Sequence, residues 1–131
     1  MQNLSPIEQA LMQQRQMLGV LYTSLTRTRQ RLYALEAAEK LRALGRAPAM
    51  PIEFRSQFGE DLLLYDAFDG KTDGFFIEVG AFDGYNYSVT YALEAMGWKG
   101  LLIEAIPPRA EECKARRDRK STRLNSSHLV I

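Results

Sequence analysis

The sequence is poor in the residues that build covalent or metal-based sites. It holds one cysteine, Cys113, and one histidine, His128. A single thiol excludes an internal disulfide, and one cysteine with one histidine is too small a set to hold a structural zinc ion. We therefore expect no metal site, and we give His128 no catalytic role.

Long apolar runs are also missing. No stretch approaches the roughly 20 apolar residues that a membrane-spanning helix needs. The N-terminus has no basic region leading into a compact apolar segment, so it does not resemble a secretory signal. With 46% hydrophobic and 25% charged residues, the composition is typical of a globular protein. We expect a cytoplasmic protein with no membrane span.

The formal net charge of +1 conceals an uneven distribution. Basic side chains outnumber acidic ones up to residue 47, and the reverse holds for residues 48–117. Arg27, Arg29 and Arg31 lie at alternate positions, which point to different faces of a helix. We interpret them as solvated charges and expect no nucleic-acid partner.

Residues 4–44 carry apolar side chains at alternating steps of three and four. Eight apolar positions follow this pattern, and two polar residues complete it: Leu4, Ile7, Leu11, Gln14, Leu18, Leu21, Leu25, Thr28, Leu32 and Leu35. The pattern predicts a long helix that is capped by Ser5, begins at Pro6 and ends before Gly45. Two interpretations stay open: a coiled coil that makes the chain a homo-oligomer, and an amphipathic helix packed on its own domain.

Pro48 and Pro51 mark residues 48–55 as a linker that separates the helix, in residues 1–47, from a second unit in residues 56–117. Residues 118–131 resemble translated sequencing-adapter sequence, and we treat them as a non-native tail. The alternative is a genuine polar tail with a short final strand.

The second unit begins with a predicted helix and strand. Ser56 is positioned to cap a helix that carries Phe58, Leu62, Tyr65 and Phe68 on one face and ends at Gly70. The apolar run 75–79 then predicts a strand buried on both faces.

A glycine turn, a helix and a second strand follow. Residues 80–84 form the turn, and the next helix carries Val89, Ala92, Leu93 and Met96 before Gly97 closes it. The second strand, residues 101–103, ends in Glu104, and a further helix begins at Pro107 and Pro108.

Two acids at the strand ends point to a ligand. Glu78 stands near the end of a buried strand, where a carboxylate is costly unless it is paired or reaches a ligand. Glu104 stands 20 residues after Gly84, close to the distance at which an acid of a doubly wound fold receives the ribose hydroxyls of an adenosine. A carboxylate suits a diol because it accepts hydrogen bonds from both hydroxyls.

The glycine spacing narrows the choice of cofactor. Gly80 and Gly84 do not complete a G-x-G-x-x-G fingerprint, so a pyrophosphate cradle is disfavoured. An adenosine cofactor is the favoured interpretation. A nicotinamide or flavin site and a purely structural turn remain open.

At these residues the sequence resembles the FkbM family of S-adenosylmethionine-dependent methyltransferases. The similarity covers about half the chain and includes 56–61, 75–84, Ser88, Thr90, Tyr91, Leu93, Glu94, Gly97, Trp98, Gly100, Leu101 and 103–107. One departure is visible, because the family usually has proline directly after the strand-end acid, and here Ala105 and Ile106 precede Pro107.

The resemblance implies an α/β fold. The chain would hold a truncated Rossmann-like methyltransferase domain, with the first two parallel strands and their flanking helices, behind the long N-terminal helix. It also implies S-adenosyl-L-methionine as cofactor. The residues implied to line its site are Glu78, Gly80, Ala81, Asp83, Gly84, Ser88 and Glu104, with Gln57 and Asp61 as a lid or outer layer or as plain helix-surface residues.

The function so implied is O-methylation of a hydroxyl on a sugar or natural product, with a small molecule or glycan as acceptor. No catalytic base can be named, and the segment is expected to be inactive by itself. Two alternatives stay open. One is a non-catalytic assembly protein in which residues 4–44 oligomerise, and the other is a nucleotide-cofactor oxidoreductase.

Overall fold

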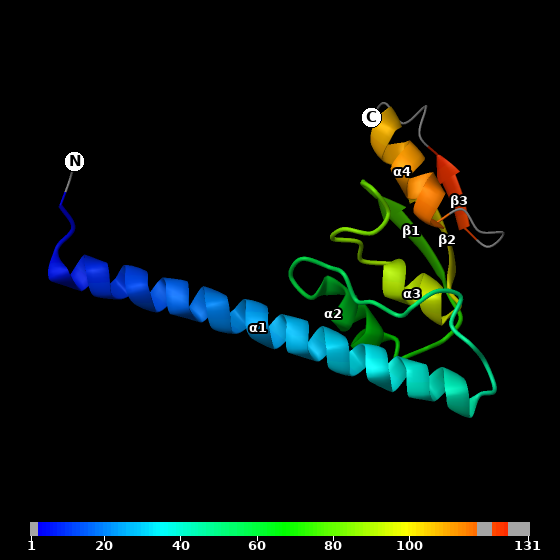
Figure 1. Ribbon diagram of the computed structural model, residues 1–131, viewed down its shortest axis with the longest axis horizontal. Helices are drawn as coiled ribbons and strands as arrows, with labels where there is room; N and C mark the ends of the chain where they lie inside the picture. The colour runs from blue at the N-terminus through cyan, green and yellow to red at the C-terminus, as the bar shows by residue number, and fades with distance from the viewer. Residues whose placement is uncertain (1–2, 118–121, 126–131) are drawn as a thin grey trace.

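The computed structural model describes residues 3–117 and the backbone of residues 122–125. The chain combines a long helix with a small α/β unit (Figure 1). The elements in chain order are α1 (Pro6–Ala43), α2 (Glu60–Ala67), β1 (Phe75–Val79), α3 (Tyr91–Met96), β2 (Lys99–Ile103), α4 (Pro107–Arg117) and β3 (Thr122–Asn125).

The strands form one parallel sheet in the order β1-β2-β3. Both predicted strands are present, and Val79 at the end of β1 lies opposite Ile103 at the end of β2. The third strand lies within the segment that we expected to be a non-native tail. Residues 118–121 and 126–131 of that tail, with His128, lie outside the described residues.

One face of the sheet carries the core. Phe76 and Leu102 point to this face and pack with Leu93 of α3 and Cys113 of α4. The prediction that β1 is buried on both faces is wrong, because its alternate residues Phe75, Ile77 and Val79 are 66%, 60% and 73% exposed. An unbroken apolar run does not specify that a second layer is present, and α3 and α4 both lie on the Phe76 side.

Both ends of α1 agree with the prediction. Ser5 and Glu8 form a capping box, in which the Ser5 hydroxyl accepts from the Glu8 amide and the Glu8 carboxylate accepts from the Ser5 amide. Pro6 is the first helical residue, Leu44 is the C-cap and Gly45 follows with a φ of 69°. Among residues 3–117 and 122–125, no helix is both long and apolar enough to span a membrane.

The long helix packs on the α/β unit, but through a face that the pattern did not predict. The buried residues of α1 are Thr26, Gln30, Ala37 and Leu41. The leucines of the predicted seam, by contrast, are solvent-exposed throughout. The packing interpretation is therefore correct for the helix as a whole and wrong for the seam.

A small apolar core joins α1 to the rest of the chain. Ala37 of α1 packs with Leu62 and Tyr65 of α2 and with Ala92 of α3. Phe54, from the segment expected to be a linker, is part of this core. Its ring meets the Tyr65 ring edge-on, with 5.7 Å between the ring centroids. Residues 48–55 are thus part of the packing as well as a connection.

The helix α2 begins later than predicted. Gly59 is its N-cap with a φ of 84°, so Ser56 is not the cap residue. Ser56 instead hydrogen-bonds Asp61, with its amide 3.0 Å and its hydroxyl 2.5 Å from the carboxylate oxygens. The Gln30 side-chain amide donates to the Ser56 carbonyl at 3.0 Å. These buried polar groups connect α1 to the segment that precedes α2.

Candidate functional site

Glu78 and Glu104, the two predicted acids, lie at the same edge of the sheet. Glu78 is the penultimate residue of β1, and Glu104 directly follows β2. Because β1 and β2 are parallel and end side by side, both carboxylates lie at the carboxyl edge. This is the edge at which open α/β sheets bind their ligands.

Glu104 joins the end of β2 to the turn after β1. One carboxylate oxygen accepts from the Phe82 amide at 2.7 Å, and the other accepts from the Ile106 amide at 2.9 Å. The Ile103 carbonyl completes the connection by accepting from the amides of Gly80 and Ala81. Since each carboxylate oxygen can accept two hydrogen bonds, Glu104 keeps capacity for a pair of hydroxyl donors.

Glu78 turns toward the start of α3. Its carboxylate accepts from the amides of Val89 at 2.8 Å and Thr90 at 3.2 Å, and from the Ser88 hydroxyl at 3.3 Å. Burial raises the pKa of Glu78, against the opposing effects of the Val89 amide and the Arg117 charge. The carboxylate thus has partners within the chain without any ligand.

Asp83 shapes the turn itself. Its carboxylate accepts from the amides of Tyr85 at 3.0 Å and Asn86 at 2.8 Å, and from the Asn86 side chain at 2.6 Å. Burial alone would raise the pKa of Asp83, but these hydrogen bonds from Tyr85 and Asn86 outweigh it and hold the pKa below its ordinary value. Asp83 therefore stabilises the turn by binding residues 85 and 86, which follow it closely.

The two glycines of the turn have different roles. A β-carbon at Gly84 would lie 2.8 Å from the Cys113 sulfur and 3.0 Å from Cγ of Arg117, so Gly84 allows α4 to approach. A β-carbon at Gly80 would meet no atom within 4 Å. Both have positive φ, of 74° at Gly80 and 79° at Gly84, which glycine adopts without strain.

A hollow of about 140 Å³ lies beside the turn. Four of the seven predicted site residues line it, namely Glu78, Gly80, Ala81 and Ser88. The other lining residues are Val79, Phe82, Asn86, Tyr87 and Val89. Asp83, Gly84 and Glu104 do not line it, although Glu104 holds the Phe82 amide at its rim.

Arg117 organises this site, and the sequence reasoning missed it. Its side chain is fully buried and forms an ion pair with Glu94 of α3. It also donates to the Gly84 carbonyl and the Ser88 hydroxyl, both at 3.1 Å. The sequence carries no signal for this role, because basic residues are common in the last turn of a helix.

Arg55 brings a second positive charge to the turn. Its guanidinium lies 4.1 Å from the centre of the Tyr85 ring and donates to the Asn86 side chain at 3.4 Å. Its Nε atom is buried and, within the described part of the chain, has no hydrogen-bond partner. Since Asn86 lines the hollow, Arg55 is a donor close to it.

Gln57 and Asp61 do not border the hollow. Asp61 is fully buried in the contact with Ser56 and Gln30, so its position is that of a link between α1 and α2 and not of a surface residue. Gln57 is exposed.

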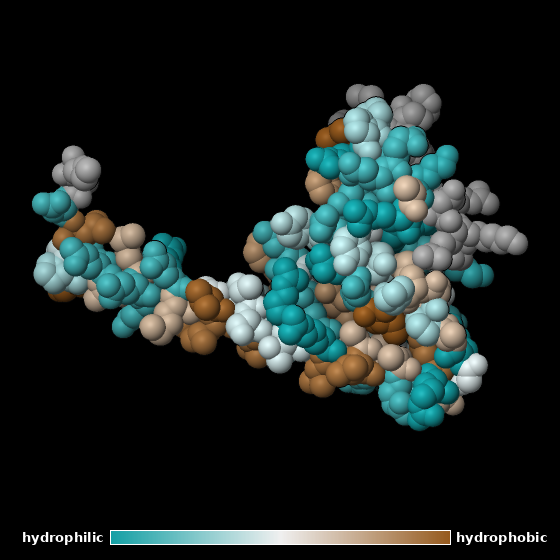
Figure 2. Space-filling view, viewed as in Figure 1, coloured by the Kyte–Doolittle hydropathy of each residue, from teal (hydrophilic) through white to brown (hydrophobic). Residues whose placement is uncertain are grey.

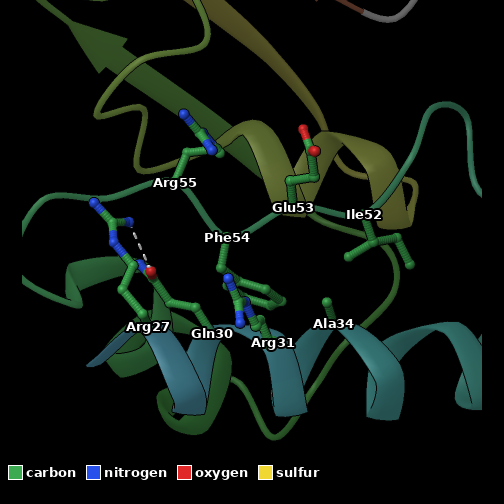
Figure 3. A pocket seen from close by; sticks show the side chains of 8 residues that line it. All are labelled: Arg27, Gln30, Arg31, Ala34, Ile52, Glu53, Phe54 and Arg55. Atoms are coloured by element: carbon green, nitrogen blue, oxygen red, sulfur yellow. Dashed lines mark hydrogen bonds between the residues drawn. The ribbon is translucent and has the colours of Figure 1, made fainter. Parts of the chain in front are cut away.

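A separate hollow of about 510 Å³ lies between α1 and residues 52–55 (Figure 3). Three arginines line it, but they do not converge. Arg27 donates to Gln30 at 3.0 Å, whereas the Arg55 side chain points away from α1. The Phe54 side chain points from residues 52–55 toward α1. We therefore do not assign this hollow as the functional site.

No cluster of metal-ligating side chains is found among residues 3–117 and 122–125. Comparisons of the chain with protein-family models, with curated proteins and with solved structures find no match. The carboxylates at the strand ends and the 80–84 turn are therefore the features that indicate a function.

Proposed function

We propose that the chain is the cofactor-binding part of a Rossmann-like S-adenosyl-L-methionine-dependent methyltransferase. The observation that carries the proposal is the placement of Glu78 and Glu104 at the ends of adjacent parallel strands, on either side of the 80–84 turn. The resemblance of residues 75–104 to the FkbM family supports the same cofactor.

The residues at this edge fit an adenosine cofactor. A carboxylate can accept about four hydrogen bonds, and Glu104, which is 9% exposed, makes two of them with the Phe82 and Ile106 amides, so the ribose hydroxyls would use the remaining two. Gly80 presents backbone without a side chain to the hollow, so a ligand can approach closely. Arg55 offers a charge of the sign that suits the cofactor's carboxylate.

When bound, S-adenosyl-L-methionine supplies an electrophilic methyl group on its sulfonium sulfur. The chain contributes binding and orientation, because methyl transfer depends mainly on placing the acceptor in line with that group. We assign no side chain as a general base. The acceptor is a hydroxyl of a sugar or natural product, and the described hollow supplies no group for recognising it.

Uncovered apolar surface on β1 supports the proposal that this is part of a larger fold. Phe75, Ile77 and Val79 expose more than half of their side chains on the face opposite α3 and α4. Rossmann-like sheets carry helices on both faces, and such an apolar face needs cover. Ligand binding is therefore to be measured on the complete gene product that contains this chain.

Calorimetric titration with S-adenosylhomocysteine and with NAD tests the proposal. We expect micromolar binding of S-adenosylhomocysteine and at least tenfold weaker binding of NAD. Glu104→Gln should weaken S-adenosylhomocysteine binding, whereas Glu111→Gln, at an exposed position on α4, should not. Tighter binding of NAD would favour an oxidoreductase, and no binding of either compound would contradict a cofactor site.

A further inference from the structure

We propose that α1 pairs with α1 of a second copy of this chain as a parallel two-stranded coiled coil. The proposal is independent of the methyltransferase assignment. The positions of each seven-residue repeat of α1 are labelled a to g, and the contact surface is the seam formed by positions a and d. Every a position holds leucine, whereas the d positions hold both apolar and polar residues. The a residues are Leu4, Leu11, Leu18, Leu25 and Leu32, and the d residues are Ile7, Gln14, Leu21, Thr28 and Leu35.

The seam lies on a different face of α1 from the contact with the α/β unit. In the heptad that starts at Leu25, Thr26 and Gln30 are 7% and 3% exposed, whereas Leu25 itself is 60% exposed. The buried residues occupy positions b, c and f, which lie opposite a and d. The α/β unit lies on one side of α1 (Figure 1), and the leucines of the seam stay exposed.

The N-terminal half of α1 projects beyond the rest of the chain (Figure 1). Every residue from 3 to 25 is exposed, and near the end of this stretch the Tyr22 hydroxyl donates to the carbonyl of Phe58, in the loop before α2. Most helical stability in proteins comes from packing of an apolar face and not from helix propensity alone. Apolar side chains are exposed along this projection, as Figure 2 shows, so a partner helix would stabilise it.

The polar residues of the seam favour a parallel, in-register pair. In that arrangement Gln14 lies beside Gln14 of the second copy, where each amide can both donate and accept a hydrogen bond. Thr28 lies beside Thr28 in the same way. A fully overlapping antiparallel pair would instead place Gln14 against Leu25 and Thr28 against Leu11, which buries polar groups beside apolar ones.

The charges that flank the seam are complementary in a parallel pair. Arg31 at a g position lies near Glu36 at the following e position of the second copy, with opposite charge. One Glu36 oxygen accepts from the Tyr65 hydroxyl of its own chain at 3.0 Å, so Arg31 would share a carboxylate that is already hydrogen-bonded. The remaining pairs of this kind contain no like charges: Ala10 with Arg15, Met17 with Tyr22, and Ser24 with Arg29. The charged residues at e and g positions favour two strands, because larger bundles bury these positions more deeply; they are Glu8, Arg15, Arg29, Arg31 and Glu36.

Analytical ultracentrifugation of the full chain tests the pairing. We expect a species of twice the chain mass at micromolar concentration. Leu18→Glu should convert it to a single copy, whereas Val20→Glu should leave it paired, because Val20 is as exposed as Leu18, at 69% and 66%, but lies outside the seam. Fluorescence of the buried Trp98 checks that each variant keeps its α/β unit.

Disulfide formation tests the direction of the helices. Gln14→Cys should cross-link two copies under mild oxidation, whereas Gln16→Cys, on the opposite side of the helix, should not. The wild-type chain controls for Cys113, which is 1% exposed. A wild-type chain that sediments as one copy, or as three or more copies, would overturn the proposal. Equal effects of Leu18→Glu and Val20→Glu on the sedimenting mass, or equal cross-linking at positions 14 and 16, would overturn it as well.

Discussion

Gly84 and Cys113 are so close that the turn after β1 tolerates no side chain at position 84. A β-carbon at Gly84 would lie 2.8 Å from Sγ of Cys113 and 3.2 Å from its Cα. The glycine turn therefore does two things at once: one end packs against α4, and the other end, at Gly80, faces open space. Alanine at position 84 should therefore affect stability differently from alanine at position 80.

Gly84→Ala should destabilise the chain more than Gly80→Ala. Both replacements place alanine at a positive φ, which costs about 1–2 kcal/mol. Gly84→Ala adds a steric conflict with Cys113, worth about 1–3 kcal/mol. Urea denaturation of the two variants measures the difference, and equal losses of unfolding free energy would show that α4 does not pack on this turn.

Arg117→Met should cost about 3–5 kcal/mol of unfolding free energy, because it leaves the buried carboxylate of Glu94 without its cationic partner. The double variant Arg117→Met with Glu94→Leu should recover much of that loss, since both charges are then removed. A thermodynamic cycle from urea denaturation measures the coupling. A loss below about 1 kcal/mol in the single variant would contradict the buried ion pair.

Glu78 should make the chain less stable as the pH rises. Burial raises its pKa in the folded chain above the ordinary value of 4.5, so its contribution is complete below that value and is lost as the pH rises through the folded pKa. Relative to Glu78→Gln, the wild type should lose about 1.4 kcal/mol between pH 4 and 7 for each unit by which the pKa is raised. Urea denaturation at both pH values checks this, and parallel pH profiles would contradict it.

The thiol of Cys113 should be unreactive in the folded chain. Burial raises its pKa to about 11, so little thiolate is present at pH 8. We expect labelling by a chromogenic disulfide reagent to be on the order of 100-fold slower than in the urea-unfolded chain. Gly84→Ala should accelerate it by loosening α4, whereas labelling of the wild type at the unfolded rate would contradict the packing of Cys113.

Local signals in the sequence predicted most of the elements. The apolar runs before Gly80 and Glu104 predicted β1 and β2, and Pro107 predicted the start of α4. Ser5, with proline after it, predicted the first residue of α1. In each case the signal is a backbone preference or an apolar pattern that acts within a few residues.

Contacts between distant segments could not be predicted in this way. Gln30 is polar, so no apolar pattern marks it as buried, yet Ser56 and Asp61 satisfy it across the chain. Arg117 is buried only because Glu94 and Ser88 lie opposite it. The pairing of Glu104 with the Phe82 amide likewise depends on the parallel arrangement of β1 and β2.

The central claim is that Glu104 holds the ribose of an adenosine cofactor, and a double-mutant cycle tests it most directly. Calorimetry on the complete gene product would compare S-adenosylhomocysteine with its 2′-deoxy analogue, each against wild type and Glu104→Gln. Thermal melting of the variant controls for the loss of its contact with the Ile106 amide. We predict a coupling of about 1–3 kcal/mol between the carboxylate and the 2′-hydroxyl. A coupling of zero, with the same affinity loss for both ligands, would contradict the claim.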